Sequence, residues 1–254
     1  MGALLEVTGI RKSFGAVEAL RGMDLVVQPG EVVAVVGDNG AGKSTLIKVI
    51  SGVHPADDGE ILLNGTPVHF QSPRDARASG IETIYQDLAL ANHLNVGANI
   101  FLGRELMKRW LGVFPIIDNS MIYRETVSLL NRIESRIPDA RSPVLNLSGG
   151  QRQAVAIARA MYWKAKLVIM DEPTAALAVP EARNVLGLVD SLKKEGIGVI
   201  YIDHNLVLAL EAADKVVVMN RGSKVYETDA ADTDQEELVR YMTGTAGIQK
   251  GRMK

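Results

Sequence analysis

The sequence has no cysteine, only 5% aromatic residues and no excess of one charge. Without cysteine the chain can form no disulfide, no reactive thiolate and no cysteine-ligated zinc site, which suits a cytosolic protein. No apolar run approaches the roughly 18 residues needed to span a bilayer, and no signal-peptide pattern opens the sequence. We therefore expect any membrane role to come through a partner.

The charges are nearly balanced, with 28 Lys and Arg against 30 Asp and Glu and a net charge of −2. This balance gives no general reason to expect nucleic acid as a ligand. Hydrophobic residues make up 47% of the 254 positions, so the chain can bury a full core and is not disordered. The length lies between one large domain and two small ones, and no internal repeat is present.

A glycine-rich stretch lies between a predicted strand at residues 31–36 and a predicted helix at residues 45–50. It fits the pattern G-x-x-x-x-G-K-[ST], in which backbone N–H groups and a helix N-terminus cradle a polyphosphate. Lys43 would reach the β- and γ-phosphates, and the Ser44 hydroxyl would ligate Mg²⁺. The alternative, a dinucleotide-binding turn, would carry G-x-G-x-x-G without the Lys-Ser pair. The loop residues are Gly37, Asp38, Asn39, Gly40, Ala41, Gly42, Lys43 and Ser44.

Two adjacent acids end an apolar strand predicted at residues 167–170. Burying unpaired charge is costly, so carboxylates at the tip of a buried strand need a partner. Beside a phosphate loop that partner is a metal ion. Asp171 would hold Mg²⁺, through water, and Glu172 would orient and deprotonate the attacking water. Without the phosphate loop, the same pair could equally be a surface turn.

The stretch Leu147, Ser148, Gly149, Gly150 and Gln151 reads LSGGQ and precedes a helix predicted at residues 151–162. Ser148 is a favourable N-cap, and the glycines leave backbone N–H groups accessible, so this is a second candidate anion site. With this motif the chain resembles the nucleotide-binding subunits of ABC transporters over nearly its full length. In that family each LSGGQ helix caps the ATP held by the other protomer of a head-to-tail dimer.

The strand and helix pattern, together with this resemblance, predicts an α/β fold with a P-loop NTPase core. Its mostly parallel sheet would be joined by an N-terminal antiparallel β subdomain and by a helical insert that carries the LSGGQ motif. Residues 1–86 and 167–245 would form the core, about 87–166 the helical subdomain, and 246–254 a frayed tail. Strands are predicted at 4–10, 23–27, 31–36, 60–63, 68–70, 81–85, 167–170, 199–202 and 216–219, and further helices at 121–132 and 180–194.

The resemblance assigns further site residues one by one. Phe14 matches the aromatic residue that stacks on adenine, Gln86 the residue that touches Mg²⁺ and the water, and His204 the histidine that contacts the γ-phosphate. A core position for Phe14 and a structural role for His204 are the alternatives. The expected ATP-binding residues are Phe14, Gly37, Asp38, Asn39, Gly40, Ala41, Gly42, Lys43, Ser44 and Thr45. The expected metal ligands are Ser44, Gln86 and Asp171.

Two positions depart from the broad family pattern. Ala178 stands where most members have Asp, and Asp203 stands where Ser is usual before the histidine. The first departure puts communication across the dimer interface in doubt. The same pattern resembles that of sugar-importer ATPases, which often lack this Asp and have a Glu a few residues later. In this chain that residue is Glu181.

Residues 72–76, 80–90 and 99–105 also resemble the ribose, xylose and fructose importers. The single set of motifs resembles the shorter, fructose-type members, so we expect the chain to pair with itself. The resemblance implies an ATPase at the cytoplasmic face of the inner membrane that binds a permease, with a sugar-binding protein as an indirect partner. The alternatives are a different solute, a soluble ATPase of this fold, or an ATP-gated clamp with little turnover. Residues 108–117 could face a permease or a membrane, but packing under a loop is favoured.

Overall fold

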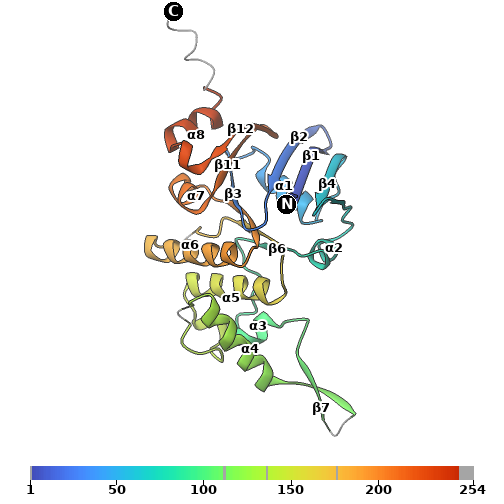
Figure 1. The fold of residues 1–254 in the computed structure, drawn as a ribbon, viewed down its shortest axis with the longest axis vertical. Coiled ribbons are helices and arrows are strands. Elements are labelled where there is room, and N and C mark those ends of the chain that lie inside the picture. Colours follow the sequence, from blue (N-terminus) through green and yellow to red (C-terminus); the bar gives the residue numbers. More distant parts are fainter. Residues whose placement is uncertain (1, 111–112, 136, 176, 246–254) are drawn as a thin grey trace, which may run out of the picture.

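The computed structural model describes residues 2–110, 113–135, 137–175 and 177–245 (Figure 1). Its centre is a 6-stranded sheet in which every neighbouring pair is parallel except the antiparallel pair β11–β12. This confirms the predicted α/β fold with a mostly parallel sheet. The strands, in order across the sheet, are β12 (Ser223–Asp229), β11 (Lys215–Asn220), β3 (Val32–Val36), β10 (Gly198–Ile202), β9 (Leu167–Asp171) and β6 (Ile81–Ile84).

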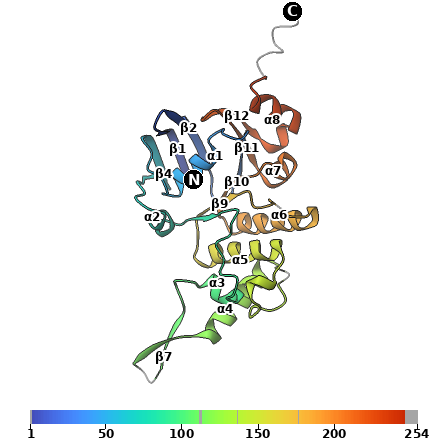
Figure 2. The same cartoon turned by 180° about the vertical axis from the view of Figure 1, so that it is seen from behind.

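Both faces of this sheet are covered, which explains the uninterrupted apolar runs of its strands. On β3, Val33 and Val35 pack into one core with helix α1 (Lys43–Ile50) and the antiparallel strands. Val32, Ala34 and Val36 point the other way, into a core shared with three helices. These helices are α5 (Gly149–Tyr162), α6 (Val179–Lys194) and α7 (Leu206–Ala212), and Figure 2 shows α5 and α6 side by side.

An antiparallel sheet forms the predicted β subdomain. Its order is β2-β1-β4-β5, from strands β1 (Leu5–Phe14), β2 (Val17–Val27), β4 (Asp58–Leu63) and β5 (Thr66–Pro67). The expected strand at 68–70 is wrong, because the pairing ends at Pro67. Strands β1 and β2 are longer than predicted, since register shifts along β1 break the two-residue alternation by which strands are recognised.

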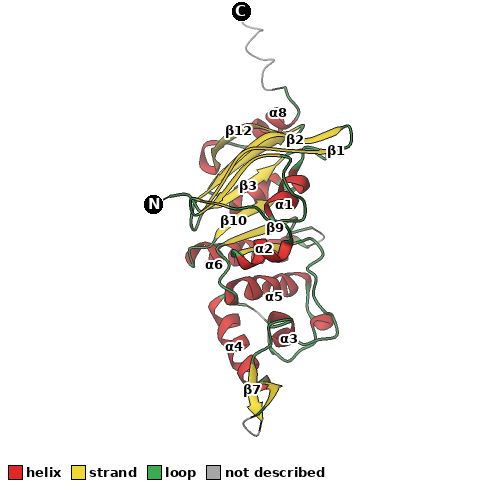
Figure 3. Cartoon of the chain, turned by 90° about the vertical axis from the view of Figure 1, so that its right-hand side faces the viewer, coloured by secondary structure: helices red, strands yellow, loops and turns green. Residues whose placement is uncertain are grey.

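The region from 87 to 166 is helical, as expected, but it also contains a hairpin of β7 (Met107–Trp110) and β8 (Phe114–Ile117). The prediction that residues 108–117 pack under a loop is wrong for the residues of that stretch that the structure describes, 108–110 and 113–117. Val113 is 72% and Phe114 59% exposed, and the hairpin projects at the end of the molecule opposite α8 (Figures 1 and 3). The helices of this region are α3 (Val96–Ile100), α4 (Asn119–Arg132), the 3₁₀ turn at Val144–Asn146 and α5.

The remaining elements are α2 (Pro73–Ala78), the 3₁₀ turn at Ala230–Asp232 and α8 (Gln235–Met242). Strand β12, α7 and α8 had not been predicted. Helix α8 packs against β11 and β12, where the rings of Tyr226 and Tyr241 stack with centroids 3.9 Å apart. The tail expected at 246–254 lies outside the described residues. Among those described, no helix has the length and apolar composition required to cross a membrane.

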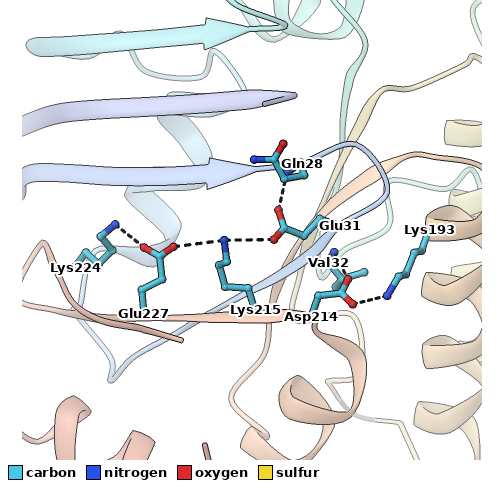
Figure 4. A network of polar contacts seen from close by, with 8 residues as sticks. All are labelled: Gln28, Glu31, Val32, Lys193, Asp214, Lys215, Lys224 and Glu227. Carbon is cyan, nitrogen blue, oxygen red and sulfur yellow. Dashed lines mark hydrogen bonds and ion pairs between the residues drawn. The ribbon is translucent and has the colours of Figure 1, made fainter. Parts of the chain in front are cut away.

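A polar network joins the beginnings of β3 and β11 to β12 and α6 (Figure 4). Lys215 lies between two carboxylates, 3.4 Å from Glu31 and 3.6 Å from Glu227. Asp214 accepts a hydrogen bond from the backbone N–H of Val32 at 3.0 Å and forms an ion pair with Lys193. Because β3 and β11 run parallel, the network lies at the sheet edge opposite to the one where their carboxyl ends lie. It anchors the fold at a distance from the loops that follow β3 and β9.

The first prediction concerns the close approach of β4 to β1. Gly59 has φ +93°, and a Cβ there would lie 2.6 Å from the carbonyl oxygens of Thr8 and Gly9. Gly65 has a similar φ of +72° but nothing within 4 Å. In urea unfolding, Gly65→Ala should cost about 1 kcal/mol for the left-handed alanine alone. Gly59→Ala should cost about 3 kcal/mol, because the backbone must also move. Equal losses in the free energy of unfolding for the two variants would contradict the steric role assigned to Gly59.

Candidate functional site

Five parallel strands, β11, β3, β10, β9 and β6, end at one edge of the sheet, and the loops beyond the last four carry most of the predicted site residues. A cavity of about 470 Å³ opens at this edge. It brings together the phosphate loop after β3, the two acids at the end of β9 and the histidine after β10. The residues that line it are Val17, Glu18, Ala19, Arg21, Asn39, Gly40, Ala41, Gly42, Lys43, Ser44, Thr45, Asp171, Glu172, His204 and Arg221.

The phosphate loop turns directly into helix α1, which begins at Lys43 and has Gly42 as its N-cap. No side chain caps this N-terminus, so its first-turn N–H groups and the positive end of its dipole face the cavity. A Cβ on Gly42 would lie 2.7 Å from the carbonyl oxygen of Ala19, so only glycine fits where the loop meets β2. The loop therefore has the geometry of an anion-binding turn.

The Lys43 ammonium lies back along this loop, where it donates hydrogen bonds to the carbonyls of Gly37 at 2.6 Å and Asp38 at 3.1 Å. Burial lowers the pKa of Lys43, and the nearby carboxylates, Glu172 foremost, oppose that shift. A buried ammonium that is held only by neutral carbonyls can gain from an anionic ligand in the same cavity.

Asp171 and Glu172 lie side by side at the end of β9. Burial raises the pKa of Asp171, and the negative charge of Glu172 raises it further. A cation here would offset that unfavourable charge. Among the described residues, no three His, Cys, Asp or Glu side chains gather as a metal site, so a divalent ion would depend on a mixed oxygen set. The Ser44 hydroxyl and the Asp171 carboxylate both line the cavity and are the hard oxygen ligands that suit Mg²⁺.

Glu172 and His204 meet although they are 32 positions apart in the chain. The Nε2 of His204 lies 2.6 Å from Oε1 of Glu172. Glu172 has φ +51°, in the left-handed region, and its backbone N–H donates to the carbonyl of Ile202 at 2.8 Å. This strained backbone directs the carboxylate toward the histidine, so both side chains are presented to the same cavity.

Gln86 and Phe14 do not line this cavity, and neither do Gly37 and Asp38 at the start of the phosphate loop. Gln86 is exposed and lies two residues beyond the end of β6. Phe14, at the end of β1, is 45% exposed, so a core position is excluded. Its ring lies edge-on to His54, with centroids 5.2 Å apart, and the Lys12 ammonium is 5.7 Å from its centroid. The sequence around His54 gives no indication of this contact.

The LSGGQ stretch lies at the N-terminus of α5, outside the cavity. Ser148 accepts a hydrogen bond from the backbone N–H of Gln151 at 3.4 Å, and the Gln151 side chain accepts one from the N–H of Ser148 at 2.9 Å. This reciprocal capping box starts the helix at Gly149, two residues before the predicted start. One chain thus presents two separate helix N-termini, of which only α1 faces the cavity.

The structure also shows residues that the sequence did not indicate. Arg21 of β2 and Arg221 of the β11–β12 turn also line the cavity, where the Nε of Arg21 lies 3.6 Å from the carboxylate of Glu18. Neither lies in a recognisable motif, because their approach depends on pairing between distant strands. Ala178, one of the two departures, takes the N-cap of α6 without a side-chain bond. A larger hollow of about 660 Å³, near the ends of α4 and α5, contains none of the predicted residues.

Comparison with known proteins agrees with this geometry. Residues 20–175 match the family model described as ABC transporter. The chain is 50% identical to the xylose/arabinose import ATP-binding protein XylG of Sulfolobus acidocaldarius, over 97% of this chain and 96% of that protein. It is 42% identical to the fructose import ATP-binding protein FrcA of Rhizobium meliloti, over 95% and 94%. It is 44% identical to the ribose import ATP-binding protein RbsA 1 of Rubrobacter xylanophilus, over 96% of this chain but 48% of that protein.

Solved structures show the same fold. A nucleotide-free ATP-binding cassette from an ABC transporter superposes with a TM-score of 0.79 at 27% identity, over 95% of this chain and 96% of that one. The ADP conformation of another ATP-binding cassette superposes with a TM-score of 0.77 at 27% identity, over the whole of both chains.

The second prediction tests the phosphate loop. Lys43→Ala removes the only ammonium that lies within the loop, whereas Lys48→Ala removes an exposed ammonium from the same helix. Titration with a fluorescent ATP analogue should show binding weakened about 10- to 100-fold by the first change, the value of a charge-assisted hydrogen bond. The second change should alter affinity little. Undiminished affinity of Lys43→Ala would show that the loop is not the phosphate site.

Proposed function

This chain belongs to the ABC transporter family, and on that premise we propose that it is the ATP-hydrolysing subunit of a sugar importer. It would drive uptake through a separate membrane permease. The observation that carries the proposal is the convergence of the phosphate loop, Asp171, Glu172 and His204 on one cavity. Import of a sugar is supported by the names of relatives that match the chain from end to end, one for xylose and arabinose and one for fructose. No residue described above selects among these sugars.

ATP would bind with its phosphates along the loop from Gly37 to Thr45, where backbone N–H groups and the α1 dipole favour negative charge. Lys43 would move from the loop carbonyls to the β- and γ-phosphates. Phe14 is exposed enough for its ring to stack on adenine, held at its edge by His54. Arg221 lines the same cavity, as does Arg21, whose charge is partly offset by Glu18 at 3.6 Å.

Mg²⁺ would be held by Ser44 and Asp171, with Gln86 as a further oxygen ligand. The raised pKa of Asp171 supports this assignment, because a cation would relieve the repulsion between Asp171 and Glu172. The ion would neutralise charge on the phosphates. Gln86 lies outside the cavity, so it would have to approach when the helical region moves.

Hydrolysis would depend on Glu172 as the base that orients and deprotonates the attacking water. His204, hydrogen-bonded to Glu172 at 2.6 Å, would turn its ring toward the γ-phosphate. Both side chains are partly exposed, His204 by 49% and Glu172 by 27%, so each can be reached by water and substrate.

A dimer would complete the site. Because the LSGGQ residues lie outside the cavity of their own chain, they would cap the ATP bound by a second copy in a head-to-tail arrangement. Residues 1–86 and 167–245 would act as the catalytic core and about 87–166 as the helical subdomain. Closure on two ATP molecules and reopening after hydrolysis would move this subdomain, and the permease would receive that motion.

The subunit would lie at the cytoplasmic face of the plasma membrane, held there by the permease. A sugar-binding protein would be an indirect partner that delivers the solute to the permease. Sugar import is favoured over a soluble role for this ATPase, because the long end-to-end matches are import proteins.

The third prediction separates an enzyme from an ATP-gated clamp. Glu172→Gln keeps the shape of the side chain and removes the proton acceptor. Steady-state hydrolysis should fall by about 10² to 10⁴, the usual value of general-base catalysis, while ATP binding persists. Glu211→Gln, an exposed change on α7, is the matched control and should leave the rate unchanged.

The same substitution has a second consequence for assembly. Neutralising Glu172 removes a like charge near the γ-phosphate, so size-exclusion chromatography with ATP and Mg²⁺ should show more dimer than for the parent chain. Hydrolysis by Glu172→Gln at the parent rate would overturn the assignment of the base. A lower rate without any dimer would keep the base and show that pairing requires the permease.

The fourth prediction tests completion of the site by a second copy. Ser148→Arg should leave nucleotide binding nearly intact and abolish hydrolysis, because the bulky cation blocks the α5 N-terminus. Mixed with Lys43→Ala, which keeps a normal LSGGQ motif, it should recover about one working site per heterodimer. Absence of recovery would argue against the head-to-tail arrangement.

A further inference from the structure

The carboxylate of Asp203 is buried between the two loops that carry Glu172 and His204. It is 6% exposed and accepts hydrogen bonds from the hydroxyl of Tyr201 at 2.9 Å, from the hydroxyl of Thr174, and from the backbone N–H of Asn205 at 2.9 Å. Within the described residues, no lysine, arginine or histidine forms an ion pair with it. This carboxylate is therefore held by hydrogen-bond donors alone.

A buried carboxylate without a cation is stable only when donors surround it. Burial and the adjacent Asp203 charge raise the pKa of Tyr201, so its hydroxyl remains a neutral donor. The two hydroxyls share Oδ2, while Oδ1 takes the N–H of Asn205. Such an arrangement fixes the positions of all the groups that point at the carboxylate.

The three donors differ in where they come from. Tyr201 and Asn205 belong to the same segment as Asp203, at the end of β10 and just beyond it. Thr174 comes from the loop after β9, two residues beyond Glu172. Of the three hydrogen bonds, only the one from Thr174 therefore joins the two loops.

We propose that Asp203 is a positioning residue, which tethers the loop of Glu172 to the loop of His204 through Thr174. This inference rests on the proposed function, since it assigns those two side chains to hydrolysis. Both side chains end in partly exposed positions, where packing alone cannot fix their 2.6 Å separation. Two buried hydrogen bonds set the separation of Glu172 and His204. One runs from the Thr174 hydroxyl to Asp203, and the other from the backbone N–H of Glu172 to the carbonyl of Ile202.

A neighbouring hydrogen bond also connects the loop after β9 to helix α5. The Nε2 of Gln153, on α5, donates to the carbonyl of Pro173 at 2.7 Å and holds the residue between Glu172 and Thr174. The loop after β9 is thus anchored to α5 at Pro173 and to the loop after β10 at Thr174. Loss of the second anchor would leave the strained Glu172 backbone free to relax away from His204.

The fifth prediction compares three substitutions of the hydroxyl donors in the full chain. Thr174→Val keeps the shape and removes the bond between loops, so kcat should fall on the order of 10- to 100-fold, with KM for ATP nearly unchanged. Thr174→Ser retains the hydroxyl and should restore most of the rate. Tyr201→Phe removes a donor of the same carboxylate and the contact of its hydroxyl with Thr174, but it leaves the Thr174–Asp203 bond between the loops in place. It should therefore lower thermal stability and reduce kcat less than Thr174→Val does.

A kcat that falls equally in Thr174→Val and Tyr201→Phe would overturn the tether. The Thr174 hydroxyl would then serve only to satisfy the buried charge of Asp203. Thr174→Ala serves as the second variant where valine does not fold. Hydrogen exchange on the nucleotide-free chain gives a readout that needs no hydrolysis. In Thr174→Val, amides 203–206 should exchange about fivefold faster, the value of one net hydrogen bond.

The exchange measurement also separates this inference from the proposed function. Absence of ATP hydrolysis in the parent chain, together with faster exchange in Thr174→Val, would overturn the function and keep the tether. Unchanged exchange at amides 203–206 in both Thr174→Val and Thr174→Ala would overturn the tether, whether or not the parent chain hydrolyses ATP.

Discussion

A parallel sheet that is buried on both faces can present polar groups only where its strands end, and this constraint governs the chain. The strand β3 is fully buried, with alternate residues in two different cores, so it has no solvent-facing side. Its carboxyl end and those of β9 and β10 meet at one edge, because the strands are parallel. Glu172 and His204 therefore converge, in the loops just beyond β9 and β10, on the phosphate loop and on Lys43, the first residue of α1.

Burial at this edge shifts the pKa values of two side chains in opposite directions. It lowers the pKa of Lys43 and raises that of Asp171, since each charged form loses water without gaining a full partner. A phosphate offsets the first cost and a divalent cation the second. One ligand that brings both, a metal–nucleotide complex, matches the site better than either component alone. The opposite edge, with the Lys215 and Asp214 ion pairs, has its charges already matched within the chain.

The parts that could be predicted from the sequence are those where the chemistry is contiguous. The phosphate loop, the acids after β9 and the LSGGQ helix start each lie within a few residues, so their spacing alone indicates a strand end or a helix N-terminus. Arg21, Arg221 and the Thr174–Asp203 bond could not be predicted, since each depends on which strands become neighbours. The exposed hairpin at 107–117 was misplaced for the opposite reason. Its apolar composition is typical of a core, but in the described part of the chain β7 and β8 pair with each other and with no other strand.

The two LSGGQ glycines differ in what surrounds them within their own chain. A Cβ on Gly149 would lie 2.3 Å from the terminal Cδ2 atom of Leu177, so the end of that side chain would have to move to admit it. A Cβ on Gly150 would meet only ordinary contacts, the nearest 3.7 Å away at Glu181. Gly150 is the second residue of α5, and alanine is intrinsically the better helix former. These contacts do not require glycine at 150, which fits the proposal that a second copy's phosphate approaches this helix start, because a backbone without a side chain leaves its N–H groups accessible.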